Sequence, residues 1–355
     1  MPLNHYITLG RSGLRVSPYC LGTMTFGEDF GWGASPEESF AMLDEYRDRG
    51  GNFVDTANIY TFGHSEQIIG DYLKQNQIRR DSLVLSTKFY CNLLLGDPNG
   101  GGGGRKAMIQ QCEASLKRLQ TDYIDIYWLH NWDRSAPIEE TMRGLDDLVR
   151  AGKIRYVGFS DIPAWKTAEA QTLAHFRGWA PIIALQLEYS LLERTSEGEL
   201  FPMAQAMGMA IMPWSPLKSG FLSGKFRRDS TGHVDTKRTN MVGVPSAADY
   251  DIIETVVDVA AERGISPASV ALAWVRAQTG VSSTLIGARR LDQLKANLDS
   301  LDVTLSAEQL NKLREVSKPR LNFPAENNEM LAPMLAFPDM TIDGKTAPSM
   351  ARLSD

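Results

Sequence analysis

The sequence predicts an α/β fold, a TIM (β/α)8 barrel of eight parallel strands, and three observations lead to this prediction. Eight short runs of β-branched or apolar residues alternate with longer segments of helical period along the 355 residues. Glycines such as Gly152 and Gly208 follow helical segments, where a left-handed C-terminal cap is favoured. The first glycine-containing turn, LGTMTFG at Leu21, lacks the GxGxxG spacing of a doubly wound dinucleotide-binding fold.

Each element follows from its local pattern, and we take the elements in chain order. An N-terminal β-hairpin is expected, with strands at 6–9 and 14–16 around Gly10. The barrel strands are predicted at the short apolar runs 17–22, 52–55, 83–88, 123–130, 156–160, 182–188, 209–214 and 283–287. Amphipathic helices are predicted after these strands, at 36–49, 65–74, 106–119, 138–151, 164–176, 197–207, 267–277 and 291–298. Ser65 and the pair Ser266 and Pro267 have the character of helix starts.

Three segments fall outside the strand and helix repeat. The loop 97–104 ends in five glycines, and we expect it to be flexible because no GK[ST] follows to complete a phosphate-binding loop. Residues 218–248 are long for a βα loop and predict a lid. The part 218–240 of this lid carries six basic and two acidic residues, a local charge of +4. An extra helix is expected at 249–263, after the seventh strand.

The C-terminal tail, 318–355, is rich in proline and methionine and has no clear period. Three placements stay open for it: it closes a pocket, contacts a neighbouring subunit, or lies on the surface. We treat 1–355 as a single domain whose barrel core covers about 6–317. The oligomeric state stays open.

Composition and charge exclude several classes of protein. With 43% hydrophobic residues the chain has too many apolar groups for a disordered protein, and its net charge of −6 offers no general attraction for nucleic acid or an anionic membrane. No run of sequence reaches the length of a membrane span, and the start lacks the apolar core of a signal peptide, so a cytoplasmic protein is expected. Three scattered cysteines and five scattered histidines show no metal-ligand spacing, so no metal site is expected.

Four polar residues at or near strand ends form the candidate catalytic set. Asp55 ends the second strand, Lys88 the third and His130 the fourth, while Tyr60 follows Asp55 by five residues. Each alone has an ordinary structural explanation, as a turn cap, a solvated charge or a packed side chain. In a TIM barrel, however, the carboxyl ends of the strands meet at one rim, and this rim carries the active site. We therefore expect these residues to act together.

The chemistry of this set suits proton donation. A carboxylate keeps a neighbouring ammonium charged, and an ammonium near a phenol lowers the phenol pKa from about 10 toward the range of a general acid. A histidine at the next strand end can hold the same substrate oxygen. No nucleophile of the GxSxG kind accompanies them. The set therefore fits a carbonyl that receives a hydride from a cofactor.

The chain also resembles the aldo-keto reductase superfamily, in particular its larger bacterial and plant branch, which includes the potassium-channel β subunits. The resemblance covers roughly 6–317. It rests on ordered motifs at the predicted strand ends: LGTMTFG at Leu21, FVDTANIYTFGHSEQIIGDYL at Phe53, LSTKF at Leu85, SLKRLQTDYIDIYWLHNWD at Ser115, GKIRYVGFSD at Gly152, QLEYSLLER at Gln186, MPWSPLKSGFLSGK at Met212 and LIGARRLDQLKANL at Leu285.

The resemblance implies NAD(P)H-dependent carbonyl reduction, in either direction, with Tyr60 as general acid and base. Lys88 and Asp55 would tune this tyrosine, and His130 would orient the carbonyl. It also implies a dinucleotide across the barrel mouth. The cofactor-binding residues would be Thr23, Met24, Asp55, Ser160, Gln186 and Trp214 at the nicotinamide end, Ser215, Leu217 and Lys225 along the pyrophosphate, and Gly287, Arg289, Gln293 and Asn297 at the adenosine end.

Residue chemistry supports several of these assignments independently. Trp214 offers a flat π face, Gly287 opens the turn before a helix N-terminus, and Arg289 can bind a 2′-phosphate through its planar fork. The pair Arg289 and Arg290 favours NADPH, while NADH stays possible. Many members have Asn after the serine of the GxS motif, whereas Asp161 stands here. Because an ionised acid cannot donate to the carboxamide, we do not count Asp161 as a cofactor ligand.

Two other functions stay open beside the reductase. One is a nicotinamide-binding regulatory subunit similar to the channel β subunits, and the other is a cofactor-free isomerase or lyase on the same barrel. The expected partner is a small-molecule carbonyl or alcohol, whose identity the sequence does not give. Four aromatic residues are candidates for the wall of its pocket: Trp32, Phe62, Tyr90 and Trp132.

Overall fold

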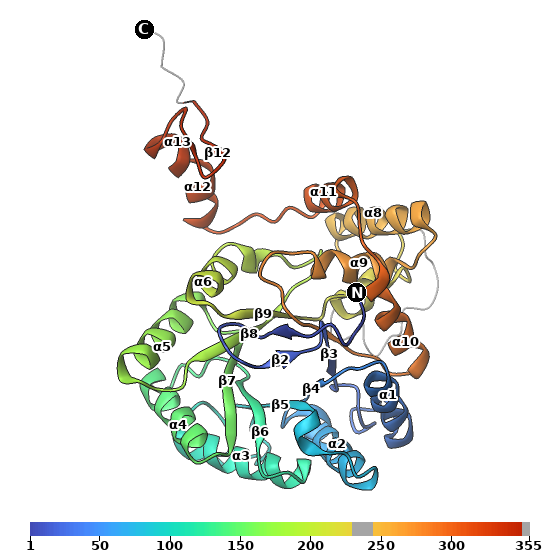
Figure 1. Cartoon of the computed structure of the whole chain (residues 1–355), viewed down its shortest axis with the longest axis vertical. Coiled ribbons are helices and arrows are strands. Elements are labelled where there is room, and N and C mark those ends of the chain that lie inside the picture. Colours follow the sequence, from blue (N-terminus) through green and yellow to red (C-terminus); the bar gives the residue numbers. More distant parts are fainter. Residues whose placement is uncertain (229–243, 350–355) are drawn as a thin grey trace.

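Eight parallel strands form the centre of the molecule in the computed structural model, which describes residues 1–228 and 244–349 (Figure 1). Their order is β10-β3-β4-β5-β6-β7-β8-β9, and a parallel bridge between Ile211 and Val281 links the last strand toward the first. The predicted TIM barrel is confirmed. The strands are β3 (Tyr19–Gly22), β4 (Phe53–Asp55), β5 (Val84–Phe89), β6 (Ile124–Leu129), β7 (Ile154–Ser160), β8 (Ile182–Glu188), β9 (Ala210–Trp214) and β10 (Thr284–Ile286).

A helix follows each strand and covers the outside of the barrel. The helices of the repeat are α1 (Pro36–Asp48), α2 (His64–Gln75), α3 (Arg105–Leu119), α4 (Ile138–Arg150), α5 (Ala164–Arg177), α6 (Leu200–Met207), α9 (Pro267–Arg276) and α10 (Leu291–Asp299). The extra helix expected after the seventh barrel strand is α8 (Ala247–Arg263). The predicted elements thus match the observed ones to within a few residues at most boundaries.

Alternating side chains fill the inside of the barrel. Phe53, Ile126, Trp128 and Met212 point inward and are fully buried. Gly158 is required beside this layer, because an added Cβ would lie 2.2 Å from the ring of Trp128. The packed interior leaves the ends of the strands as the place for a site.

The N-terminal hairpin closes the other end of the barrel, as predicted. Strands β1 (Ile7–Thr8) and β2 (Arg15–Val16) pair antiparallel and lie across the barrel in Figure 1. Leu9 and Val16 pack on the inward-facing side chains, and the backbone N–H of Arg11 donates to the carbonyl of Gly208 at 2.8 Å. With this end sealed by the hairpin, the carboxyl ends of the strands form the rim where the predicted site residues lie.

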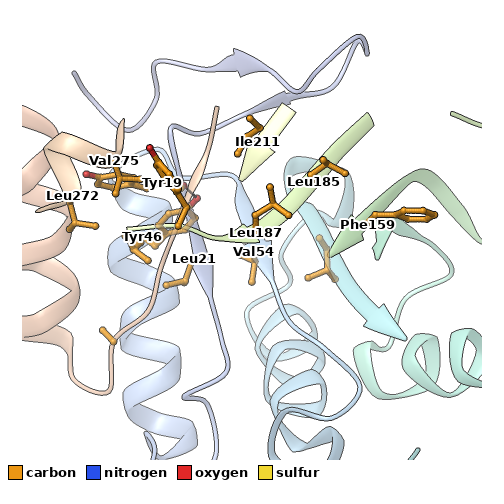
Figure 2. Packing of buried hydrophobic residues seen from close by; sticks show 14 of the residues in the cluster. Tyr19, Leu21, Tyr46, Val54, Phe159, Leu185, Leu187, Ile211, Leu272 and Val275 are labelled. Atoms are coloured by element: carbon orange, nitrogen blue, oxygen red, sulfur yellow. Dashed lines mark hydrogen bonds between the residues drawn. The ribbon is translucent and has the colours of Figure 1, made fainter. Parts of the chain in front are cut away.

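A second apolar layer lies between the strands and the helices. Figure 2 shows Leu21 of β3 near Tyr46 of α1 and Leu272 of α9, with Leu185 of β8 and Phe159 of β7 on the other side of the same view. The strands are therefore apolar on both faces over most of their length, as parallel strands buried on both sides are. Polar residues at their carboxyl ends are the exception to this pattern.

Two boundary predictions need correction. Ser65 is not a helix cap: α2 begins at His64 after Gly63, which adopts a φ of 95°, and Ser65 lies inside the first turn. The helix α11 (Ala307–Val316) was missed. Its start carries a capping box in which Ser306 and Gln309 exchange hydrogen bonds, a spacing that is readable in the sequence.

The glycine-rich loop is packed against neighbouring backbone and side chains, while the flexibility expected for it stays a prediction. The N–H of Gly102 donates to the carbonyl of Tyr90 at 2.7 Å, and that of Gly103 donates to the carboxylate of Asp133 at 2.8 Å. A Cβ on Gly101 would lie 2.8 Å from the Tyr90 oxygen. Glycine is needed at Gly101 because the chain passes close to other backbone there.

The tail is more regular than its sequence suggested. It forms two short helices, α12 (Ala325–Met330) and α13 (Ala332–Ala336), and a hairpin of β11 (Thr341–Ile342) and β12 (Lys345–Thr346), all lying to one side of the barrel in Figure 1. Within the described residues, no helix is long and apolar enough to cross a membrane. The central part of the predicted lid, 229–243, lies outside the described residues.

Candidate active site

A cleft of about 1000 Å³ opens at the carboxyl ends of the strands. Its lining runs from Tyr60 and His130 at one end to Arg289 and Asn297 at the other. The predicted site residues that line it are Met24, Asp55, Tyr60, His130, Ser160, Gln186, Trp214, Ser215, Leu217, Lys225, Gly287, Arg289, Gln293 and Asn297. Two predicted residues, Thr23 and Lys88, are fully buried behind this surface.

A buried ion pair forms the base of the cleft. Lys88 on β5 donates to the carboxylate of Asp55 on β4, and both side chains are fully buried. Asp55 also accepts from the hydroxyl of Ser86 at 2.6 Å and from the amide of Gln186 at 3.2 Å. Burial alone would lower the pKa of Lys88, but the negative charge of Asp55 and the hydrogen bonds to Asp55 and Tyr60 raise it above its ordinary value. The lysine therefore stays an ammonium at neutral pH.

Tyr60 is held over this pair at the start of a strained turn. Its hydroxyl accepts a hydrogen bond from Nζ of Lys88 at 3.0 Å. The turn η1 (Tyr60–Gly63) that follows places Thr61 and Phe62 at φ values of 46° and 57°, which L-residues rarely adopt. Thr61 is fixed there because its hydroxyl donates to the carbonyl of Phe26 at 2.8 Å. The turn thus aims the phenol into the cleft.

The expected lowering of the Tyr60 pKa is wrong for this structure. Burial raises the pKa of Tyr60 above its usual value; the charge of Lys88 lowers it only in part, and the charge of Asp55 raises it. Our sequence reasoning counted the ammonium but not the loss of solvent around the phenol. The hydroxyl therefore keeps its proton at neutral pH, as a proton donor must.

His130 lies beside Tyr60 as a neutral imidazole. The two ring centres are 6.1 Å apart and the rings are nearly perpendicular, at 82°. Burial and the charge of Lys88 lower the pKa of His130 to about 3. The sulfur of Cys91, another residue of the cleft wall, lies 4.0 Å from Nδ1 of His130. At neutral pH one ring nitrogen of this histidine can donate while the other accepts.

The predicted nicotinamide end lies at the carboxyl ends of β7, β8 and β9. Ser160 and Gln186 are almost fully buried but line the cleft, and the Nε1 proton of Trp214 is donated to Asp161 at 3.1 Å. Because the amide nitrogen of Gln186 bonds to Asp55, its carbonyl oxygen is the group left to accept from a ligand. These groups converge on one wall of the cleft.

Thr23, predicted near the nicotinamide ribose, is fully buried behind the cleft surface. Its hydroxyl donates to the backbone carbonyl of Asp55 at 3.0 Å and bonds with Ser65 at 2.9 Å, so it is occupied within the protein. The neighbouring Met24 is 42% exposed and lines the cleft. The cofactor-binding role expected for both residues stays a prediction.

The predicted pyrophosphate region follows β9. Ser215 adopts a φ of 52°, and its hydroxyl accepts from the N–H of Ser219 at 3.1 Å. Leu217 and Lys225 lie farther along the same wall. Lys218, by contrast, pairs with Glu188 at 2.7 Å, so part of the basic charge counted in the lid is balanced locally.

The predicted adenosine end lies at the start of α10, where two details change the sequence interpretation. Arg290 forms two hydrogen bonds of 2.9 Å with Asp292, so part of the positive charge counted for the pair Arg289 and Arg290 is balanced locally, although both arginines line the cleft. The N–H of Leu291 at the helix start donates to the carboxylate of Glu38 at 2.6 Å, so one anion-binding group is already occupied. The backbone N–H of Arg289 donates to Gln293 at 3.1 Å.

Sequence reasoning missed several residues of the site. Ser86, which bonds to Asp55, was readable because residues two apart in a strand share a face, and Ser86 stands two before Lys88. Other residues line the cleft without an earlier signal, because the sequence does not give the path of the loops and turns after the strands or the face that α9 turns to the cleft: Cys91, Asn131, Ser219, Gly220, Phe221, Phe226, Leu272 and Ala288. Tyr90, predicted for the pocket wall, does line it.

The other three predicted wall residues, Trp32, Phe62 and Trp132, are not among the residues that line the cleft. They belong to two groups of packed rings, Phe30 with Trp32 and Phe62, and Trp132 with Trp165, which we call the aromatic rim. Phe30 and Phe62 have ring centres 5.2 Å apart, and Trp132 and Trp165 meet edge to face at 5.4 Å. Phe62 and Trp165 are 65% and 58% exposed. The rim adjoins the catalytic set in the chain, because Phe62 and Trp132 follow Tyr60 and His130 by two residues each.

Comparison with known proteins agrees with this geometry. The sequence profile of the Aldo/keto reductase family matches residues 18–318. The chain belongs to the aldo/keto reductase family. Among its relatives are the uncharacterized oxidoreductase YrpG of Bacillus subtilis, 37% identical over 88% of this chain and 95% of its own length, and an aryl-alcohol dehydrogenase of Pestalotiopsis microspora, 36% identical over 90% and 84%. A norsolorinic acid reductase of Aspergillus flavus is 34% identical over 90% and 82%.

This aldo/keto reductase is therefore an oxidoreductase, and the family generally uses nicotinamide cofactors. The cleft fits such a group on its own chemistry. It has a volume of about 1000 Å³, and its lining residues include the indole of Trp214, the polar side chains of Ser160 and Gln186, and the cations Lys225 and Arg289. A dinucleotide needs this combination of a flat apolar face, hydrogen-bonding groups and anion-binding groups.

Proposed function

We propose that this protein reduces an aldehyde or ketone to an alcohol, or oxidises the alcohol, with NADP(H) as the hydride carrier and Tyr60 as general acid and base. The observation that carries the proposal is the contact of the Tyr60 hydroxyl with Lys88 at 3.0 Å, over a buried Lys88 and Asp55 pair and inside a cleft long enough for a dinucleotide. Neither a regulatory subunit nor an isomerase needs these features together.

The cofactor would lie along the cleft with its nicotinamide between Tyr60 and Trp214. Ser160 and the oxygen of Gln186 would hold the carboxamide, Ser215, Leu217 and Lys225 the pyrophosphate, and Arg289, Gln293 and Asn297 the adenosine end. When bound, the reduced nicotinamide supplies a hydride to a carbonyl carbon, and its oxidised form accepts one from an alcohol.

The protein's own part is to move one proton and to fix one oxygen. In reduction, the carbonyl oxygen gains the proton of the Tyr60 hydroxyl as the carbon gains the hydride, and the ammonium of Lys88 stabilises the phenolate left behind. The tyrosine then regains a proton from solvent. Neutral His130 donates a hydrogen bond to the same oxygen and so holds the carbonyl toward Tyr60.

The choice of NADPH over NADH rests on Arg289. A guanidinium at the adenosine end can form two hydrogen bonds with a 2′-phosphate, which NADH lacks. Glu38 at the start of α10 acts in the opposite sense, because its carboxylate repels a phosphate. We therefore expect a preference for NADPH that is moderate, with NADH still accepted.

The substrate we propose is an aromatic carbonyl or the matching aryl alcohol. The exposed faces of Phe62 and Trp165 at the rim offer stacking surfaces beside the catalytic set. Relatives named as an aryl-alcohol dehydrogenase and a norsolorinic acid reductase support the same class. Aromatic substrates should therefore have lower KM values than aliphatic ones of similar reactivity.

Turnover with both cofactors and a matched carbonyl panel tests this function. Purified protein is mixed with NADPH or NADH, and loss of the reduced cofactor is followed with aryl aldehydes, aryl ketones and aliphatic aldehydes. We expect NADPH consumption, fastest with aryl carbonyls. Cofactor binding without turnover on any carbonyl or alcohol would instead indicate the regulatory subunit, and no binding of either cofactor would indicate a cofactor-free enzyme.

A further inference from the structure

Asp161 is an acid at the wall of the cleft whose role the reaction above does not explain. It follows Ser160 at the end of β7 and adopts a φ of 53°, a strained conformation for a residue other than glycine. Its carboxylate accepts the Nε1 proton of Trp214 at 3.1 Å and lies 3.5 Å from the hydroxyl of Ser160. The acid is thus fixed to the indole on which the proposed nicotinamide would stack.

The charges around Asp161 leave it without a balancing cation. Glu188 on the neighbouring strand β8 is its nearest acid, but Glu188 pairs with Lys218 at 2.7 Å, and Glu193 lies 3.9 Å from the same lysine. Deeper in the barrel, Lys88 is paired with Asp55, and His130 on β6 is neutral at neutral pH. Within residues 1–228 and 244–349, no cation forms an ion pair with Asp161.

The geometry points to a role in choosing the redox form of the cofactor, and this inference rests on the proposed function. We propose that ionised Asp161 makes the site bind the oxidised nicotinamide cofactor more tightly, relative to the reduced one, than a neutral residue would. The oxidised nicotinamide ring carries a positive charge, whereas the reduced ring is neutral. A fixed carboxylate beside the ring therefore attracts one form and not the other.

Coulomb's law sets the size of the effect. At a separation of roughly 8 Å, the attraction changes the affinity ratio about twofold at the dielectric of water and about thirtyfold at an effective dielectric of about 20. The wall of this cleft lies between these limits. We therefore expect removal of the charge to change the ratio on the order of tenfold, which equals about 1.4 kcal/mol.

The ionisation of Asp161 gives the effect a pH dependence. Burial raises the pKa of Asp161 to about 6; the hydrogen bond from Trp214 opposes this rise, and the charge of Glu188 adds to it. The carboxylate is charged above this pH and neutral below it. Preference for the oxidised form is therefore present near pH 8 and is lost as the pH falls through about 6.

Titration calorimetry with NADP⁺ and with NADPH, from pH 5 to 8, tests the proposal. Both forms carry the same 2′-phosphate, so its own protonation cancels when their Kd values are divided. We expect the ratio of the NADPH Kd to the NADP⁺ Kd to rise roughly fivefold from pH 5 to pH 8 in the natural protein, because part of the carboxylate is still ionised at pH 5. In Asp161→Asn the ratio should stay near its low-pH value, because the amide oxygen can still accept from Trp214 but carries no charge.

Glu193→Gln is the matched control, since it removes one carboxylate from the same rim, away from the indole. We expect its ratio to follow that of the natural protein at every pH. A ratio that does not change with pH, or equal weakening of both forms in Asp161→Asn, would overturn the proposal and leave Asp161 a holder of Trp214. Failure of the natural protein to bind either form would instead refute the proposed function.

Discussion

Replacing Lys88 by methionine should destabilise the protein strongly, because it leaves the carboxylate of Asp55 buried without its cation. Both side chains are fully buried, and breaking such a pair costs about 3–5 kcal/mol. Asp55 keeps the hydrogen bonds from Ser86 at 2.6 Å and Gln186 at 3.2 Å, which stabilise its charge in part. We therefore expect the lower end of that range, about 3 kcal/mol.

Denaturation by urea, followed by circular dichroism at pH 7.5, measures this change. The double variant Asp55→Asn with Lys88→Met is the essential comparison, because it removes both charges and keeps the shapes. It should recover about half of the free energy of unfolding that Lys88→Met loses. This corresponds to an interaction energy between Asp55 and Lys88 of roughly 1.5 kcal/mol or more in the natural protein. Carbonyl reduction should stay lost in both variants, because both lack the ammonium that faces Tyr60.

Two results would refute this reasoning. One is a Lys88→Met protein within about 1 kcal/mol of the natural protein, which would mean that Asp55 is not charged or not desolvated. The other is a double variant no more stable than Lys88→Met, which would mean that the loss came from packing. Thr87→Ser, on the same strand, keeps the hydroxyl that donates to Glu66 at 2.6 Å and checks that substitution in β5 does not itself disturb the barrel.

Three further predictions concern single residues. Arg289→Ala should raise the Kd of NADPH at least tenfold, with little change in the Kd of NADH. In the control Arg290→Ala, whose arginine is paired with Asp292, neither Kd should change more than about twofold. An equal rise of both Kd values in Arg289→Ala would contradict the contact with the 2′-phosphate. Trp214→Leu should raise the Kd of NADPH about tenfold in fluorescence titration, and an unchanged Kd would exclude stacking. The pKa of His130 is about 3 in the folded protein, below its unfolded value, so the stability that this group contributes is present above about pH 6.5 and falls as the pH drops. In thermal melts, His130→Asn should therefore lose less stability than the natural protein between about pH 6.5 and 4.

Most of the fold could be predicted because its signals are local. Alternation of strand and helix patterns, with glycine caps such as Gly152 and Gly208, defined the eight repeats and the hairpin. The helix α11 was missed although its Ser306 capping box was present, because the repeat was already complete without it. The elements of the tail could not be predicted because they are too short. Helices of five and six residues, and a hairpin whose strands have two residues each, leave no periodic signal in the sequence.

The site residues that lie at strand ends could be predicted from the sequence. The pKa values and ion pairs of the site, which depend on neighbouring residues in the packed structure, could not. Asp55, Lys88 and His130 met at one rim because parallel strands bring their carboxyl ends together. The raised pKa of Tyr60 depends on how completely the turn buries it, which no residue pattern reports. The pairing of Arg290 with Asp292 and the contact of Glu38 with α10 likewise depend on the packed structure.

The most direct test of the account separates cofactor binding from chemistry in Tyr60→Phe. NADPH is titrated into the natural and variant proteins by fluorescence, and the rate of aryl aldehyde reduction is measured at saturating NADPH. Tyr6→Phe, an exposed tyrosine outside the cleft, serves as the control. We predict a Kd for NADPH within about twofold of the natural value and a rate at least about 100-fold lower in Tyr60→Phe. A rate within about tenfold of the natural protein would contradict the assignment of Tyr60 as the proton donor.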